Sequence, residues 1–145
     1  MYPHRIRLRG PWECEPLARL VIAANGRQET VTTDLPAARK MIMPCRWEEG
    51  GLKDFAGRVR FRRHFGYPGR IDENERVWLT FAGVEGTAEV WLNGQFLGRR
   101  EEPQQTFDFE ITPLLGDRNE LRVEVEGPET GGLSGEVALE IRLAI

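Results

Sequence analysis

The sequence of 145 residues predicts an all-β protein, an antiparallel β-sandwich with at most short helical turns. Two observations favour this fold class. Many segments alternate apolar and polar residues with a period of two, and Asn-Gly pairs follow two of these segments. A period of two sends successive side chains to opposite faces of a pleated strand, so each segment has one face suited to a core.

The clearest strand pattern lies between residues 76 and 112. Two segments there share an inward apolar face, formed by Val77, Leu79, Phe81, Ala88, Val90 and Leu92. Asn93-Gly94 can supply the two left-handed residues of a type I′ turn, and Asn25-Gly26 predicts a second hairpin. Thr112 before Pro113 predicts an N-cap and one helical turn, the only helical segment that we expect.

The same pattern extends over the whole chain. It predicts strands at residues 5–8, 12–15, 19–24, 28–33, 40–43, 58–65, 76–81, 88–92, 95–98, 106–109, 121–126 and 136–143. Residues 128–135 are rich in Gly and Pro but precede a strand, which indicates a loop rather than a linker. We therefore expect one sandwich domain over residues 1–145.

The order of these segments resembles the N-terminal sugar-binding domain of glycoside hydrolase family 2, which precedes the catalytic barrel in β-galactosidases, β-glucuronidases and β-mannosidases. The matching segments are residues 5–13, 43–47, 61–65, 79–98, 107–112, 119–125 and 131–139. The resemblance implies a jelly roll of the galactose-binding-like type. In the family the catalytic glutamates lie in a separate barrel that needs about 250 residues. The resemblance therefore implies a stand-alone, non-catalytic, carbohydrate-binding-like module and no enzyme.

Composition is that of an ordinary globular protein, with 40% hydrophobic and 30% charged residues. The apolar runs are far shorter than the roughly 18 residues that span a bilayer. Charged residues also stand where a signal peptide would carry its apolar region. From these observations we expect a cytoplasmic protein with no membrane partner.

Arginines alternate along the predicted strands at 5–8 and 58–65, which allows two interpretations. They form a basic face for nucleic acid or another polyanion, or they pair across strands with glutamates. The glutamates in suitable positions are Glu120, Glu124, Glu126, Glu136 and Glu140. A net charge of −3 favours pairing, so we expect no nucleic-acid partner. Arg63 lies in register with inward residues and is expected to be buried with a carboxylate partner.

The two cysteines, Cys14 and Cys45, are most simply buried thiols. A disulfide between them, or a metal site with His4 or His64, is the alternative. The short ligand spacings of metal sites are missing from the sequence. We therefore expect neither a metal nor a cofactor.

Carbohydrate recognition requires an aromatic face for the sugar ring and polar groups for its hydroxyls. The first candidate cluster is the loop that holds Arg46, Trp47, Glu48 and Asp54, which the resemblance places at the rim facing the catalytic pocket. Trp47 has a second interpretation, as a plug at the end of the sandwich.

Two more clusters qualify as ligand-binding candidates. One is the segment that holds Arg100 and Gln104. The other is an aromatic platform of Trp78 and Trp91, which would face each other if their strands were antiparallel neighbours. The loop between these strands could equally cross between the sheets, and another segment could cover both rings. Should the rings be exposed, a protein interface competes with a sugar platform, so the alternative function is a protein-interaction or assembly domain acting as an accessory subunit or homodimer.

Overall fold

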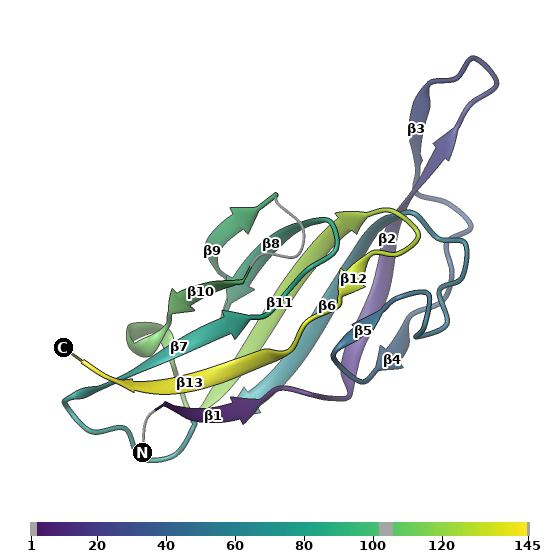
Figure 1. The fold of residues 1–145 in the computed structure, drawn as a ribbon. Coiled ribbons are helices and arrows are strands. Elements are labelled where there is room, and N and C mark those ends of the chain that lie inside the picture. The colour runs from purple at the N-terminus through teal and green to yellow at the C-terminus, as the bar shows by residue number, and fades with distance from the viewer. Residues whose placement is uncertain (1–2, 102–105, 145) are drawn as a thin grey trace.

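The computed structural model describes residues 3–101 and 106–144 and confirms the antiparallel β-sandwich. One layer is a four-stranded sheet with the order β1-β13-β7-β10. The other has the order β3-β2-β6-β11-β8-β9, with β4 also paired to β2. Figure 1 shows the two layers stacked and the β2–β3 hairpin projecting beyond them. This is the galactose-binding-like jelly roll that the sequence predicts.

The four-stranded sheet contains β1 (His4–Arg7), β7 (Glu75–Phe81), β10 (Phe107–Glu110) and β13 (Val137–Leu143). The larger sheet contains β2 (Trp12–Ile22), β3 (Gln28–Val31), β4 (Arg39–Met41), β6 (Gly57–Gly66), β8 (Thr87–Leu92), β9 (Gln95–Arg100) and β11 (Arg118–Gly127). A separate short ladder joins β5 (Cys45–Arg46) to β12 (Gly132–Leu133), and η1 (Thr112–Leu114) is a 3₁₀ turn.

The predicted strands are present, with two differences. The segments predicted at 12–15 and 19–24 form the single strand β2, because a register shift between Pro16 and Ala18 lets β2 continue along β6. Such a bulge accommodates a proline that has no N–H to donate. The short strands β5 and β12 were not predicted, because two residues show no period.

The core lies between the two layers, as the period-two pattern predicts. Every residue of the inward set between 77 and 92 is at most 1% exposed. Trp12, Phe61, Leu121 and Val123 come from the larger sheet and are also fully buried. The apolar faces of both sheets therefore bury each other, which is the main source of stability for a sandwich.

Both predicted hairpins form. Asn93 and Gly94 have φ values of 51° and 83°, as a type I′ turn requires. In the other hairpin only Gly26 has a positive φ, and its N–H donates to the carbonyl of Ala23 at 2.9 Å. The β2–β3 connection is thus a longer loop with one left-handed residue.

The predicted helical turn is present as η1, but Thr112 is not its N-cap. The capping position is Ile111, which makes no side-chain cap bond. The hydroxyl of Thr112 instead accepts a hydrogen bond from the N–H of Val77 at 2.8 Å. Its role is therefore to tie η1 to the end of the neighbouring strand β7.

Cross-strand pairing of arginine with glutamate is confirmed for several predicted partners. Arg58 and Arg60 both bind Glu124, with Nε–O distances of 2.9 and 3.1 Å. Arg63 contradicts the expectation of a carboxylate partner, because its guanidinium donates to the carbonyl of His64. Its side chain is only half-buried, so solvent reaches part of the guanidinium, while the Nε atom is buried without a hydrogen-bond partner among the described residues.

Cys14 is a buried free thiol, as expected, whereas Cys45 is a half-buried one. In residues 3–101 and 106–144, no three His, Cys, Asp or Glu side chains are grouped to hold a metal ion. The same residues contain no helix of the length and apolarity needed to cross a membrane.

Candidate functional site

The first candidate loop is built around Trp47. Its indole N–H donates to the carbonyl of Phe55 at 2.9 Å, and the two rings meet edge to face with centroids 5.8 Å apart. The backbone N–H of Trp47 donates to Gly131, which lies beside the short strand β12. Residues 47–55 therefore form a loop that covers the Trp47 ring. Trp47 is held by two hydrogen bonds, one from its indole and one from its backbone.

Trp47 is 0% exposed, so it plugs the end of the sandwich and is not a stacking surface for a sugar. The sequence allowed both interpretations, because a tryptophan near a proline fits either. The plug has a consequence for its neighbours: a loop anchored by a buried indole holds the side chains on its outer surface in fixed positions.

The polar residues of this loop lie on that outer surface. A cavity of about 360 Å³ is lined by Glu48, Glu49, Lys53, Asp54 and Glu129. Two of the predicted ligand residues, Glu48 and Asp54, therefore lie in one hollow. Arg46 instead turns toward Glu85, with 3.7 Å between guanidinium and carboxylate.

The polar groups of this cavity can form hydrogen bonds with hydroxyl groups. Its lining offers carboxylate oxygens as acceptors and one ammonium group as donor. Sugar hydroxyls can donate hydrogen bonds to the carboxylates and accept them from the ammonium group. Among the described residues the lining includes no aromatic side chain, so recognition here would depend on hydrogen bonds.

The second candidate cluster lies only partly within the described residues. The Arg100 guanidinium lies over the rings of Phe107 and Phe109, 5.5 and 4.8 Å from their centroids, and so covers an aromatic pair. Gln104 lies outside the described residues, so its placement stays a prediction.

The predicted pairing of Trp78 with Trp91 is wrong. Strand β7 pairs with β10 and β13, whereas β8 pairs with β11 and β9, so the two tryptophans belong to different sheets. Each ring carries a guanidinium: Arg142 lies 4.8 Å from the Trp78 centroid and Arg122 lies 4.2 Å from that of Trp91. The connection between β7 and β8 therefore crosses from one sheet to the other.

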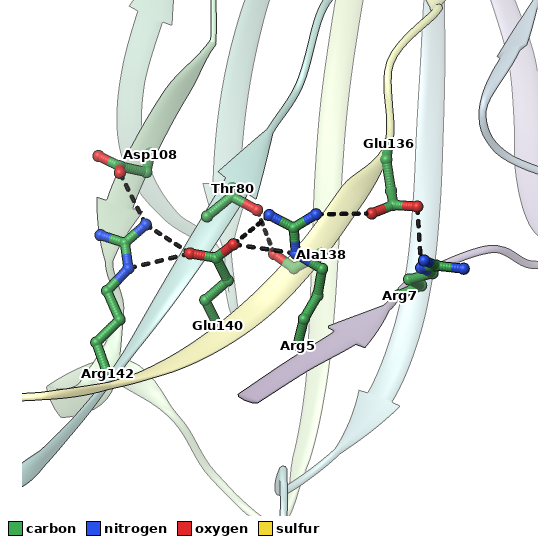
Figure 2. A network of polar contacts seen from close by, with 8 residues as sticks. All are labelled: Arg5, Arg7, Thr80, Asp108, Glu136, Ala138, Glu140 and Arg142. Carbon is green, nitrogen blue, oxygen red and sulfur yellow. Dashed lines mark hydrogen bonds and ion pairs between the residues drawn. The ribbon is translucent and has the colours of Figure 1, made fainter. Parts of the chain in front are cut away.

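A second cavity, of about 290 Å³, lies on the outer face of the four-stranded sheet and was not predicted. Figure 2 shows the polar network beside it. Glu140 accepts from Arg5 through Nε at 3.0 Å and from Arg142 at 2.8 and 3.1 Å. Arg142 also reaches Asp108 at 3.1 Å. The alternating Arg and Glu residues of β1 and β13 were the signal for this network, although not for the cavity.

Glu140 cannot act as a proton donor in this network. Burial alone would raise its pKa, but the hydrogen bonds from Arg5 and Arg142 outweigh burial and hold the pKa below the ordinary value. The pKa of Glu124 is lowered in the same way by Arg58 and Arg60, against the effect of burial. The two glutamates that the structure buries most tightly in arginine networks are therefore ionised structural groups.

The model of the family described as the glycosyl hydrolase 2 galactose-binding domain-like family matches residues 14–138. The chain belongs to this family. The match covers strands of both sheets and the whole loop of residues 47–55, so this galactose-binding-like domain accounts for most of the sequence.

Relatives of this galactose-binding-like domain are much longer proteins. The β-galactosidase large subunit of Latilactobacillus sakei is 47% identical over 53 residues, which are 36% of this chain and 8% of that subunit. A β-glucuronidase of Formosa agariphila is 33% identical over 79 residues, covering 53% of this chain and 8% of the enzyme. The chain thus spans less than a tenth of the length of these relatives.

Solved structures support the fold of the galactose-binding-like domain. The β-glucuronidase of Bifidobacterium dentium, complexed with coumarin-3-O-glucuronide, superposes with a TM-score of 0.77 at 22% identity, over 99% of this chain and 32% of that one. A β-glucuronidase of Faecalibacterium prausnitzii gives a TM-score of 0.74 at 20% identity, over 97% and 32% of the two chains. At these identities the likeness concerns the fold alone.

Proposed function

We propose that this chain acts as a non-catalytic carbohydrate-binding-like module and that its saccharide contacts come from the cavity beside Trp47. The observation that carries the proposal is that Glu48 and Asp54 line one hollow on a loop anchored by a buried indole. A rigid loop with several oriented acceptors loses little conformational entropy when a polyol binds. Membership of a galactose-binding-like family supports the same ligand class.

The non-catalytic part of the proposal is supported by the family match and by the state of two carboxylates. A glycosidase needs one carboxyl group that stays protonated near neutral pH and can donate to the leaving oxygen. Glu124 and Glu140 have pKa values shifted in the opposite direction by their arginines. The matched family model also describes a galactose-binding-like domain rather than a catalytic barrel.

Asp54→Asn is the sharpest test of the saccharide site. Asp54 has a φ of 57°, and Asn tolerates this left-handed conformation as well as Asp does, so the variant removes charge without backbone strain. Asp34→Asn is a matched control, since Asp34 has a φ of 54° on a loop far along the sequence. The measurement is calorimetric titration with galactose and with galactose-containing oligosaccharides. We expect the wild type to bind with millimolar or tighter affinity. Asp54→Asn should weaken this binding about fivefold or more, and Asp34→Asn should leave it unchanged.

Two results would overturn the proposal. One is the absence of saccharide binding by the wild type across a glycan array and in calorimetry. The other is equal binding by wild type and Asp54→Asn. Trp47→Ala is unsuitable as the test variant, because removing a fully buried indole would unfold the loop rather than probe a contact.

A second candidate function is protein interaction, in the manner of an accessory subunit or a homodimer. It is favoured by the β2–β3 hairpin, which projects from the sandwich (Figure 1) and carries Ile22 at 71% exposure. Lack of saccharide binding together with a dimeric elution volume in size-exclusion chromatography would favour this function over the first.

A further inference from the structure

One row of side chains on the outer face of the larger sheet differs from the rows beside it. The register of β2, β6, β11, β8 and β9 places five residues side by side, in the order Glu13, Arg62, Arg122, Trp91 and Phe96. The next row along the sheet contains Glu15, Arg60, Glu124, Glu89 and Arg99. There Arg60 is paired with Glu15 and Glu124, and the neighbouring Glu124 and Glu89 share Arg58. In the first row two arginines are direct neighbours.

The side chains of Arg62 and Arg122 have fewer hydrogen-bond partners than the arginine side chains of the next row. Like charges directly opposite on antiparallel strands destabilise a sheet. Within residues 3–101 and 106–144, the side chain of Arg62 makes no hydrogen bond or ion pair, and the buried Nε atoms of Arg62 and Arg122 have no hydrogen-bond partner. Arg122 has one loose ion pair, with Glu124 at 3.6 Å, although Glu124 is already bound by two other arginines. Two arginines that are directly opposite on neighbouring strands are thus left with donor capacity.

Aromatic residues fix one of these groups and flank the pair. The Arg122 guanidinium lies over the Trp91 ring at 4.2 Å, a stacking that orients its N–H groups without using them. Phe96 lies beside Trp91 with ring centroids 5.4 Å apart, and half of it is exposed. An oriented donor pair next to an exposed ring is suited to a ligand with an anionic group and an apolar face.

We propose that Arg62 and Arg122 bind the oxyanion of a ligand, and that Phe96 contacts its ring, so that this row is a subsite for a sugar carrying one carboxylate or sulfate group. Two guanidinium groups can share the oxygens of one such group through charge-assisted hydrogen bonds. The choice of a sugar ring rests on the carbohydrate-binding function proposed above. The oxyanion part rests on the arginine row alone.

The surroundings restrict the ligand to one isolated charge. Glu13 ends the row, and the neighbouring row has three glutamates, Glu15, Glu124 and Glu89, against two arginines. A chain of closely spaced phosphates would lie against these carboxylates, so the face repels a nucleic acid while the arginine pair still accepts a single oxyanion.

The test is isothermal titration of the whole chain with galacturonate, galactose 6-sulfate, galactose, inorganic sulfate and a single-stranded oligonucleotide. Arg62→Gln and Arg122→Gln remove one guanidinium each, and Arg70→Gln removes the same charge from an exposed loop as a matched control. We expect the acidic sugars to bind the wild type and the Arg70 variant equally, and each site variant about tenfold more weakly. Arg62→Gln removes a like-charge contact, so this variant should be at least as resistant to urea as the wild type.

The five ligands separate the possible results. Equal affinity of wild type and Arg62→Gln for both acidic sugars overturns the inference, and so does tighter binding of the oligonucleotide than of galactose 6-sulfate. Binding of sulfate but of neither acidic sugar overturns the assignment of a sugar ring to the ligand. If galactose binds through Asp54 but the acidic sugars gain nothing from Arg62, this inference fails and the proposed function stands. If only the acidic sugars bind, and through Arg62, the inference stands and the proposed cavity is wrong.

Discussion

Gly131→Ala should destabilise the protein through one contact, and the structure gives the size of the effect. A Cβ atom at Gly131 would lie 2.4 and 2.5 Å from two ring carbons of Trp47. The ring cannot retreat freely, because its N–H is bonded to Phe55 and its face is packed. Overpacking costs about 1–3 kcal/mol and a weakened hydrogen bond about 1 kcal/mol more, so we expect a loss of about 2–4 kcal/mol in the free energy of unfolding.

Equilibrium unfolding in urea, followed by circular dichroism, measures this loss. Gly116→Ala is the matched control, because its added Cβ would meet its nearest neighbour at an ordinary 3.6 Å. A double-mutant cycle with Trp47→Phe isolates the contact, since the smaller ring still fills most of the site and leaves room for the methyl group. The reasoning is refuted if Gly131→Ala is as stable as Gly116→Ala, or if its cost is the same in the Trp47→Phe background.

Two other predictions concern ionisation. The pKa of Glu140 is lowered on folding, so its charge stabilises the protein at neutral pH, and this contribution is lost as the pH falls through the folded pKa. Glu140→Gln should therefore lower the free energy of unfolding by about 1–3 kcal/mol at pH 7 and by much less near pH 3. A cost that is equal at the two pH values would contradict this. Burial raises the pKa of Cys14 to about 12, so in a Cys45→Ser background a disulfide reagent at pH 8 should label Cys14 only as fast as the protein unfolds, and rapid labelling of the folded protein would contradict the prediction.

Most strands could be predicted because their signal is local. In β7 and β8 the alternation of apolar and polar residues predicts both the strand and the face that is buried. Asn93-Gly94 predicts the type I′ turn, because few residue pairs accept two positive φ values. The joining of two predicted segments into β2 was not predictable, because a bulge at Pro16 depends on the partner strand.

The candidate site was predicted only in part. Glu48 and Asp54 were identified because polar residues gather in a loop, and the structure brings them to one cavity. Trp47 was identified by residue type, but its type does not say whether the loop closes over the ring. Trp78 and Trp91 were paired through a register that the sequence does not contain, since either sheet could receive β8.

The sequence by itself determined the sandwich: which residues face the core, where the chain turns, and which family it resembles. These properties follow from period, turn chemistry and segment order, all of which are written along the chain. Only the tertiary structure decided which strands are neighbours, and therefore that Arg62 lies opposite Arg122 while Trp78 and Trp91 lie in different sheets. The physical reason is that side-chain alternation specifies a face for each strand but not its partner, and every contact between strands depends on the partner.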